Sequence, residues 1–465
     1  MKKIVCTAAA LGLLAGLATT ASAVEFKISG SYTAEGIYMD KGAGHEVLTS
    51  ADKAGVAADF NNDFFGGDPV VTTAMIPTYV GGVDLWSDDA TSDAWYQHTF
   101  IVKPTMKVND KVSMAAEIRF MDNNVWGSQD DTHADKGIGG SGEIYVRALH
   151  MDYDSPIGKV RIGRIATGGY GLDFADNDTR GDRIMWWPNF LAKPWSTLFY
   201  IQKNTEHDRY DGSSSSDSDH YEARLNFKND SLDAGIRYGF TNNNSYTNPD
   251  WADNGGTADN HDNELQSVSI FGIYKMDNLF AKGELTHNFG DKTASVEYDN
   301  WGGMVQVGGK FGPATPSLMY FYASGDNDLT GDDKAFGSTG TEFTPLYILT
   351  GRNTGMLNPD QNALAHILMK QTGVHALVAA VDYAVSDRLT LHGAIGWAKA
   401  DDEFPTQDDE YGWEYNIGAA YKLLDNLTYE ARAGYLDTGD YFKFGDADIN
   451  TENVFVLSHS LTMTF

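Results

Sequence analysis

Several arginines lie within segments in which apolar and polar residues alternate, as in the run Ile118-Arg119-Phe120. In each segment the arginine shares its parity with the polar residues, and the apolar residues take the other parity. The arginines in the middle of such segments are Arg119, Arg161, Arg224, Arg237 and Arg432. A guanidinium group carries a fixed fork of N–H donors that suits carboxylates and phosphates. Gathered on one surface, these arginines could recognise small anionic solutes.

Catalytic chemistry has little support in the sequence. The chain contains no G-x-S-x-G or H-E-x-x-H motif, and its histidines are scattered rather than paired at metal-ligand spacing. Ser458 and His459 cannot form a dyad, because neighbours on a strand point to opposite faces. A calcium-loop pattern beginning at Asp326 fails because Gly337 stands where a bidentate glutamate is needed. We therefore expect no enzyme activity, no cofactor and no bound metal.

The segments that carry the arginines have the period of β-strands. Between residues 25 and 36 every even position is apolar or glycine and every odd position is polar. Similar segments are joined by tight turns at Asn109-Asp110 and Asn229-Asp230, and this arrangement is typical of β-hairpins.

The same pattern continues along the whole chain and predicts about eighteen strands. Sixteen is the alternative, because the segments near residues 143, 180, 195 and 316 alternate poorly. The connections between strands are alternately short turns and long acidic loops. The longest loops run from about Asp40 to Asp93 and from Gly325 to Thr372. The expected strands begin near residues 24, 94, 111, 143, 158, 180, 195, 220, 231, 264, 278, 299, 316, 373, 388, 411, 426 and 452.

These features predict an all-β fold, a transmembrane antiparallel up-and-down β-barrel with short periplasmic turns and long extracellular loops. Closing the sheet pairs every backbone amide within the hydrocarbon, which an open sheet cannot do. Apolar residues would then face lipid, and the mid-strand arginines would face water, since a charge on the lipid face costs about 2 to 4 kcal/mol. The alternative is a secreted β-sandwich with a dry core.

Composition narrows the class of protein further. The formal net charge of −31 argues against nucleic acid as a partner, because a phosphate-binding surface needs clustered lysine and arginine. Lys2 and Lys3 precede an apolar run that ends in Ala21-Ser22-Ala23, the pattern of a cleaved signal peptide over residues 1–23. We expect residues 24–465 to form one barrel domain. The sole cysteine, Cys6, would leave with the leader, so the mature chain forms no disulfide.

The chain ends in NVFVLSHSLTMTF, an apolar alternation that runs to a terminal aromatic residue. This ending resembles the C-terminal signature of Gram-negative outer-membrane proteins, in which Leu461, Met463 and Phe465 would form the signal read by the barrel-assembly machinery. The resemblance implies an outer-membrane location.

A second stretch, DSPIGKVRIGRIATGGYGLDFADNDTRGDR, resembles the general porin family, whose G-x-V-x-L-G-R strand is matched at Gly158, Val160, Ile162, Gly163 and Arg164. PSLMYFYASGDND is similar to strands in porins of sulfate-reducing and related bacteria. The resemblance implies a homotrimer and a loop folded into the lumen. Its carboxylates, opposite basic residues such as Arg119, Arg161 and Arg164, would be Asp173, Asp176, Asp178 and Asp182.

Opposed carboxylates and guanidinium groups across a narrow aperture would set up a transverse field that disfavours apolar solutes. The alternative is an ordinary loop with solvated acids, and Arg180 and Arg183 could pair with those acids and weaken the field. The function we expect is a water-filled channel for passive diffusion of small hydrophilic solutes and ions across the outer membrane.

Two alternatives stay open. One is a substrate-specific channel for an anionic solute, recognised by lumenal arginines that include Arg224, Arg237 and Arg432. The other is a barrel closed by its long loops, which acts as a surface adhesin or a structural protein. Acidic loops favour cations at the mouth and inward arginines favour anions deeper in, so the sequence leaves the ion selectivity undecided.

Overall fold

The computed structural model describes residues 24–40, 42–47, 79–83, 92–126, 144–166, 170–175, 180–205, 218–243, 263–293, 296–327, 331–337, 339–354, 356–357, 369–404, 407–443 and 451–465. The predicted signal peptide, residues 1–23, lies outside the described residues. No helical segment in the described part of the chain has the length and hydropathy needed to span a bilayer.

The fold is a closed, antiparallel barrel of eighteen strands, which confirms the predicted fold class and strand number and excludes sixteen. Its wall consists of β1 (Glu25–Met39), β4 (Asp93–Lys107), β5 (Val112–Val125), β6 (Ile144–Ser155), β7 (Gly158–Ala166), β8 (Arg180–Pro188), β9 (Trp195–Thr205), β10 (Ser218–Lys228), β11 (Leu232–Asn243), β12 (Asn263–Met276), β13 (Leu279–Thr293), β14 (Val296–Gly309), β15 (Ala314–Ala323), β16 (Val374–Ala384), β17 (Leu389–Lys399), β18 (Glu410–Leu424), β19 (Leu427–Thr438) and β20 (Val454–Thr464).

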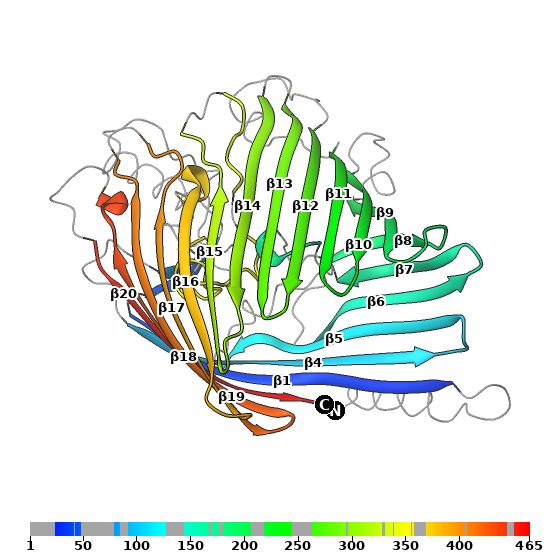
Figure 1. Ribbon diagram of the computed structural model, residues 1–465, viewed down its shortest axis with the longest axis horizontal. Helices are drawn as coiled ribbons and strands as arrows, with labels where there is room; N and C mark the ends of the chain where they lie inside the picture. The colour runs from blue at the N-terminus through cyan, green and yellow to red at the C-terminus, as the bar shows by residue number, and fades with distance from the viewer. Residues whose placement is uncertain are drawn as a thin grey trace.

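Each strand pairs with its neighbour in sequence, and the first and last strands close the ring. β20 pairs with β1 from Thr464 opposite Ser31 to Val456 opposite Met39 (Figure 1). β2 (Gly42–Val47) and β3 (Tyr79–Val83) form a separate two-stranded sheet. Two short 3₁₀ helices, η2 (Asp173–Ala175) and η3 (Asp440–Lys443), lie in the connections.

Alternation along each strand separates two surfaces. On β12 and β13, Ile270 and Leu285 are 48% and 42% exposed on the outside, whereas Ser269 and Thr286 are buried inside and share a hydrogen bond of 2.7 Å. Large apolar side chains are exposed in the same way around the described wall. Such a continuous apolar exterior is stable only against lipid.

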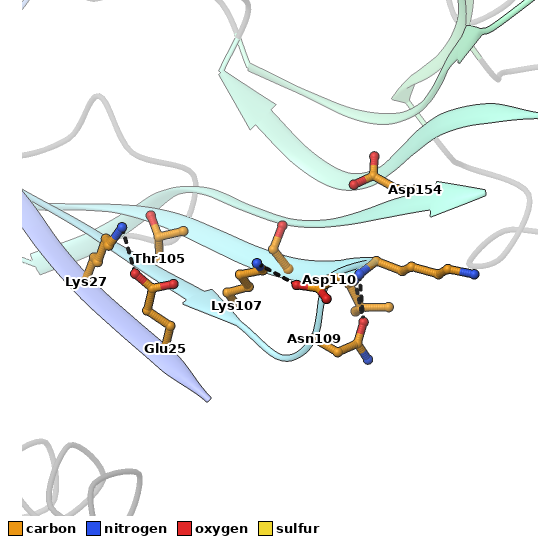
Figure 2. Close-up of a pocket in the computed structure, with 10 residues that line it drawn as sticks. Glu25, Lys27, Thr105, Lys107, Asn109, Asp110 and Asp154 are labelled. Atoms are coloured by element: carbon orange, nitrogen blue, oxygen red, sulfur yellow. Dashed lines mark hydrogen bonds and ion pairs between the residues drawn. The ribbon is translucent and has the colours of Figure 1, made fainter. Parts of the chain in front are cut away.

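The predicted turn at Asn109-Asp110 is present between β4 and β5. The Asn109 side chain accepts hydrogen bonds from the backbone N–H groups of Lys111 and Val112, at 2.8 and 3.0 Å. Figure 2 shows this turn with two ion pairs beside it, between Lys107 and Asp110 and between Lys27 and Glu25. The hydrogen bond from the Lys107 ammonium lowers the pKa of Asp110 below its ordinary value. Asn109 thus supplies locally the backbone partners that the strands cannot reach.

The poor alternation near residue 143 has a structural cause. Glu117 pairs with Ala148, but the next residue, Ile118, pairs with Val146, so Arg147 is an extra residue in β6. Both Arg147 and Ala148 are buried as a result. A bulge of this kind interrupts the period of two without ending the strand.

The apolar core lies inside the barrel rather than between two layers. Loop residues that include Phe174, Leu346 and Ile348 pack with wall residues such as Phe321 and Val374. The inner face of the β14–β20 side therefore supports packed loops.

Candidate functional site

An arginine wall covers the inner face of the barrel from β5 to β11. We use this name for Arg119, Arg147, Arg161, Arg183, Arg224 and Arg237, which β5, β6, β7, β8, β10 and β11 contribute in turn. Their side chains are mostly buried, which excludes the role of flexible surface charges.

Carboxylates hold the arginine wall at three places. Glu117 lies 3.0 Å from Arg119, 3.5 Å from Arg147 and 3.4 Å from Lys103. Asp122 lies 2.7 Å from the other side of the Arg119 guanidinium. Glu117 thus serves three cations, and Arg119 is held between two carboxylates.

The other two places repeat this arrangement. Asp152 accepts two hydrogen bonds from Arg161, at 2.6 and 2.9 Å. It also forms an ion pair with Lys159 at 2.7 Å. Glu222 accepts a hydrogen bond from Arg224 and lies 3.9 Å from Arg237. These contacts fix the guanidinium groups in place and leave the cations in excess.

Aromatic rings orient the same guanidinium groups. Arg161 lies 5.6 Å from the ring of Trp187, and Arg183 lies 4.8 Å from the ring of Tyr200. Arg183 also donates a hydrogen bond to Gln202. Rings over the flat faces leave the edges of the guanidinium groups for hydrogen bonds.

The first inward loop, residues 170–175, crosses the interior next to the arginine wall. Arg224 and Arg237 lie 5.1 and 5.4 Å from the ring of Tyr170, whose pKa is raised by burial. The Leu172 N–H donates to Glu284 of β13 at 2.7 Å. These contacts hold Tyr170 against the basic face.

The far end of the first inward loop is anchored in the apolar core. Phe174 is fully buried and packs on Phe321, Phe336 and Phe343, with ring centroids 6.3, 5.9 and 5.2 Å away. The Gly340 N–H donates to the Phe174 carbonyl at 2.7 Å. The loop therefore spans from the arginine wall to β15 and to a second loop.

This second inward loop, residues 339–354, comes from the long connection between β15 and β16. Ile348 and Leu349 donate their backbone N–H groups to the two oxygens of the buried Glu414 of β18, each at 2.8 Å. Tyr347 lies 5.3 Å from Arg432 of β19, and burial raises the pKa of Tyr347 to about 12, so its phenol stays protonated. The two loops narrow the lumen from one side.

Arg119, Arg161, Arg224 and Arg237 thus lie together on the inner wall, and Arg432 lies apart from them, near the second inward loop. Arg147 was not among the predicted site residues, and the Gly325 to Thr372 connection that contains the second inward loop entered only the alternative of a barrel closed by its loops. Bulges and loop packing leave no period in a sequence, and the only available signal was the charge of Arg147 beside a poorly alternating segment.

Two predicted site residues face outward, which corrects their assignment to the lumen. In the pairing of β7 with β8, Ile162 lies opposite Ile184 and Arg164 lies opposite Asp182. Ile162 and Ile184 are 43% and 54% exposed on the lipid side, and Arg164 and Asp182 share that face and pair at 3.6 Å. Side chains two apart on a strand point the same way, so the parity of Ile162 decides the direction of Arg164.

The remaining predicted constriction residues belong to the connection between β7 and β8. Asp173 begins η2 in the first inward loop and is exposed. Asp176 and Asp178 lie outside the described residues.

The C-terminal residues close the barrel. Gly30 and Phe465 exchange two backbone hydrogen bonds, from the Gly30 N–H at 2.9 Å and from the Phe465 N–H at 3.1 Å. Leu461, Met463 and Phe465 all face outward from the wall. Their role as an assembly signal stays a prediction.

Comparison with known proteins identifies the family. A family model described as a porin subfamily matches residues 214–462, which is more than half of the chain. The chain belongs to this porin family. It forms an outer-membrane channel for passive diffusion. A search of curated protein sequences finds no match to this porin.

Solved structures with the same fold include three proteins of Pseudomonas aeruginosa. OccK8 (OprE) and OpdQ both have a TM-score of 0.51, at 10% and 11% identity, and each match covers 94% of this porin and 98% of the other chain. OccK9 (OpdG) has a TM-score of 0.50 at 11% identity and covers 94% and 99%. At these identities the likeness concerns the fold alone. Family and fold together indicate a channel rather than an enzyme.

Proposed function

We propose that this porin passes small hydrophilic solutes and prefers anionic ones. One observation carries the preference: among the described ion pairs of β4 to β11, the four carboxylates Glu117, Asp122, Asp152 and Glu222 hold seven cationic groups. The excess positive charge is fixed by ion pairs and rings, so it acts on a passing solute without first being ordered.

The position of the loops supports the same reading. Tyr170 brings the first inward loop against Arg224 and Arg237, so the loop lies beside the basic face inside the barrel. We also propose that Asp173, Asp176 and Asp178 form the acidic side of the aperture. Their carboxylates would orient dipolar solutes, as opposed charges do across a narrow gap.

The test is the reversal potential of single channels in a potassium chloride gradient. Wild type should favour chloride, and Arg161→Glu should shift the potential toward potassium. A screened interaction of about 1 kcal/mol corresponds to about a five-fold change in the permeability ratio. Arg388→Glu makes the same charge change in the exposed turn between β16 and β17 and should have little effect.

Two results would contradict the anion preference. One is a wild-type channel that favours potassium, and the other is equal shifts for Arg161→Glu and Arg388→Glu. If wild type conducts negligibly, the alternative of a barrel closed by its loops gains support instead.

Assembly is also a proposal. The porin resemblance supports a homotrimer, a signal peptide cleaved after Ala23 and recognition of Leu461, Met463 and Phe465 by the barrel-assembly machinery. The start of β1 at Glu25, directly after the proposed cleavage site, is consistent with such processing. Native mass spectrometry of the protein extracted from outer membranes gives both the subunit number and the mass of the mature chain.

A further inference from the structure

A polar pocket of about 330 Å³ lies on the inner wall, on the side of the second inward loop that faces the short turns. Strands β14 to β19 form its floor and sides, and Thr344, Pro345 and Tyr347 of the loop cover it. The volume falls in the range of small-molecule sites. The pocket is separate from the arginine wall, since no member of that wall lines it.

Three of its charged or titratable groups, Asp382, His392 and Arg432, stand in one row across four strands, and Glu430 lies two residues before Arg432 on β19. The register aligns Asp382 of β16 with His392 of β17, then with Gly418 of β18 and Arg432 of β19. Gly418 leaves a gap in this row that the Tyr347 hydroxyl fills, since a Cβ at Gly418 would lie only 3.0 Å from that oxygen. Adjacent strands are about 4.8 Å apart, so neighbouring polar groups in the row are separated by a distance comparable to the size of a small solute.

The charges in this row are paired. His392 Nδ1 lies 2.8 Å from Asp382, and Arg432 donates to Glu430 at 2.7 Å. All four side chains remain partly exposed, with Asp382 58% and Arg432 43% accessible. The pocket therefore offers free acceptor and donor positions while its charges are largely satisfied.

A solute with hydroxyl groups matches this pattern best. Each hydroxyl both donates and accepts, so one molecule can bond to carboxylate oxygens and to N–H groups at the same time. A net anion would have to compete with Glu430 for Arg432, and a net cation would have to compete with His392 for Asp382. The partly exposed apolar side chain of Met319 gives the C–H face of a sugar ring a surface to pack on.

We propose that this pocket is a transient binding site for neutral polyhydroxylated solutes, such as sugars, during their passage. The inference requires that solutes enter the lumen, but it does not depend on the anion preference proposed above. Asp382 and Glu430 would accept hydrogen bonds from the solute, and His392, Arg432 and the Tyr347 phenol would donate to it.

Sucrose is the probe, and two measurements are made on the folded, full-length barrel. In planar bilayers, sucrose should interrupt the ion current of wild type in resolved events. In detergent, saturation-transfer NMR should show contact with sucrose without any ion flow. Asp382→Asn and Glu430→Gln should each weaken the apparent affinity about five-fold, the effect of losing about one hydrogen bond.

Asp233→Asn is the matched control. Asp233 also faces the lumen near the short turns, in β11, and forms an ion pair with Lys228. This variant should bind sucrose as wild type does. The proposal is overturned if sucrose has no effect on wild type in either measurement, if the control loses as much affinity as the pocket variants, or if sodium gluconate or glycine betaine binds more tightly than sucrose. If the channel preferred cations but still bound sucrose in this pocket, the proposed anion preference would fail while this inference would stand.

Discussion

At the scale of single residues, Glu414 is the contact on which the second inward loop depends. It is fully buried on β18, and its two oxygens accept the backbone N–H groups of Ile348 and Leu349. A buried N–H group without a partner costs about 1 to 3 kcal/mol. One inward side chain thus satisfies two loop amides that water cannot reach.

Glu414→Ala should release these two amides while the barrel stays folded. Hydrogen exchange at Ile348 and Leu349 should become about ten-fold faster or more, because the lost acceptors lower the cost of local opening. Glu35→Ala serves as control, since Glu35 also faces the lumen but accepts from the Gln97 side chain. Unchanged protection at both amides in Glu414→Ala would show that other contacts hold the loop.

At the scale of elements, the question is what allows a loop to pack flat against a β-wall. Leu346 rests on Gly396 of β17, where an added Cβ would lie 2.6 Å from a Leu346 methyl group. Gly393 lies on the same strand but faces outward, and a Cβ there would meet no atom closer than 3.9 Å. The two glycines lie three residues apart on β17 and face opposite sides of the wall, so they form a matched pair.

Gly396→Val should displace the second inward loop and increase the single-channel conductance. Overpacking of this kind costs about 1 to 3 kcal/mol, which is relieved most easily by moving the loop rather than the hydrogen-bonded strand. Gly393→Val should leave the conductance unchanged. Equal conductance in wild type and Gly396→Val would mean that the loop stays in place or does not restrict the passage.

At the scale of the whole molecule, stability depends on closing β20 against β1. The backbone of Phe465 bonds to Gly30, and its ring lies 6.1 Å from that of Phe100 on β4. The backbone hydrogen bonds between Phe465 and Gly30 remain when the side chain of residue 465 is changed. Recognition of the terminal ring by the assembly machinery would be lost. A substitution at this position can therefore separate closure from assembly.

Phe465→Ala should fold in detergent with nearly the yield of wild type, because the Gly30 hydrogen bonds remain. In cells, the same variant should reach the outer membrane in reduced amount if the terminal ring is read by the assembly machinery. Heat-modifiable migration in gels measures the folded fraction in both settings. Poor folding in detergent as well would assign Phe465 to barrel stability instead of recognition.

Much of the fold was predictable because it rests on short-range patterns. Polar and apolar faces of each strand follow from the period of two, and Asn109 supplies its turn through its own side chain. Arg161 and Arg237 could be assigned to the lumen by the same parity. Arg164 was misassigned from a motif although its parity with Ile162 already placed it outside.

The sequence by itself determined that this chain forms a closed, two-sided barrel with arginines inside, because lipid and water impose opposite demands on alternate residues of every strand. Only the tertiary structure decided which loops enter the lumen and which groups meet there. Glu414 contacts Ile348 across 66 positions of sequence, and Gly396 of β17 accommodates Leu346 of the second inward loop. Such contacts depend on shape and on buried hydrogen bonds between distant segments, which no local period records.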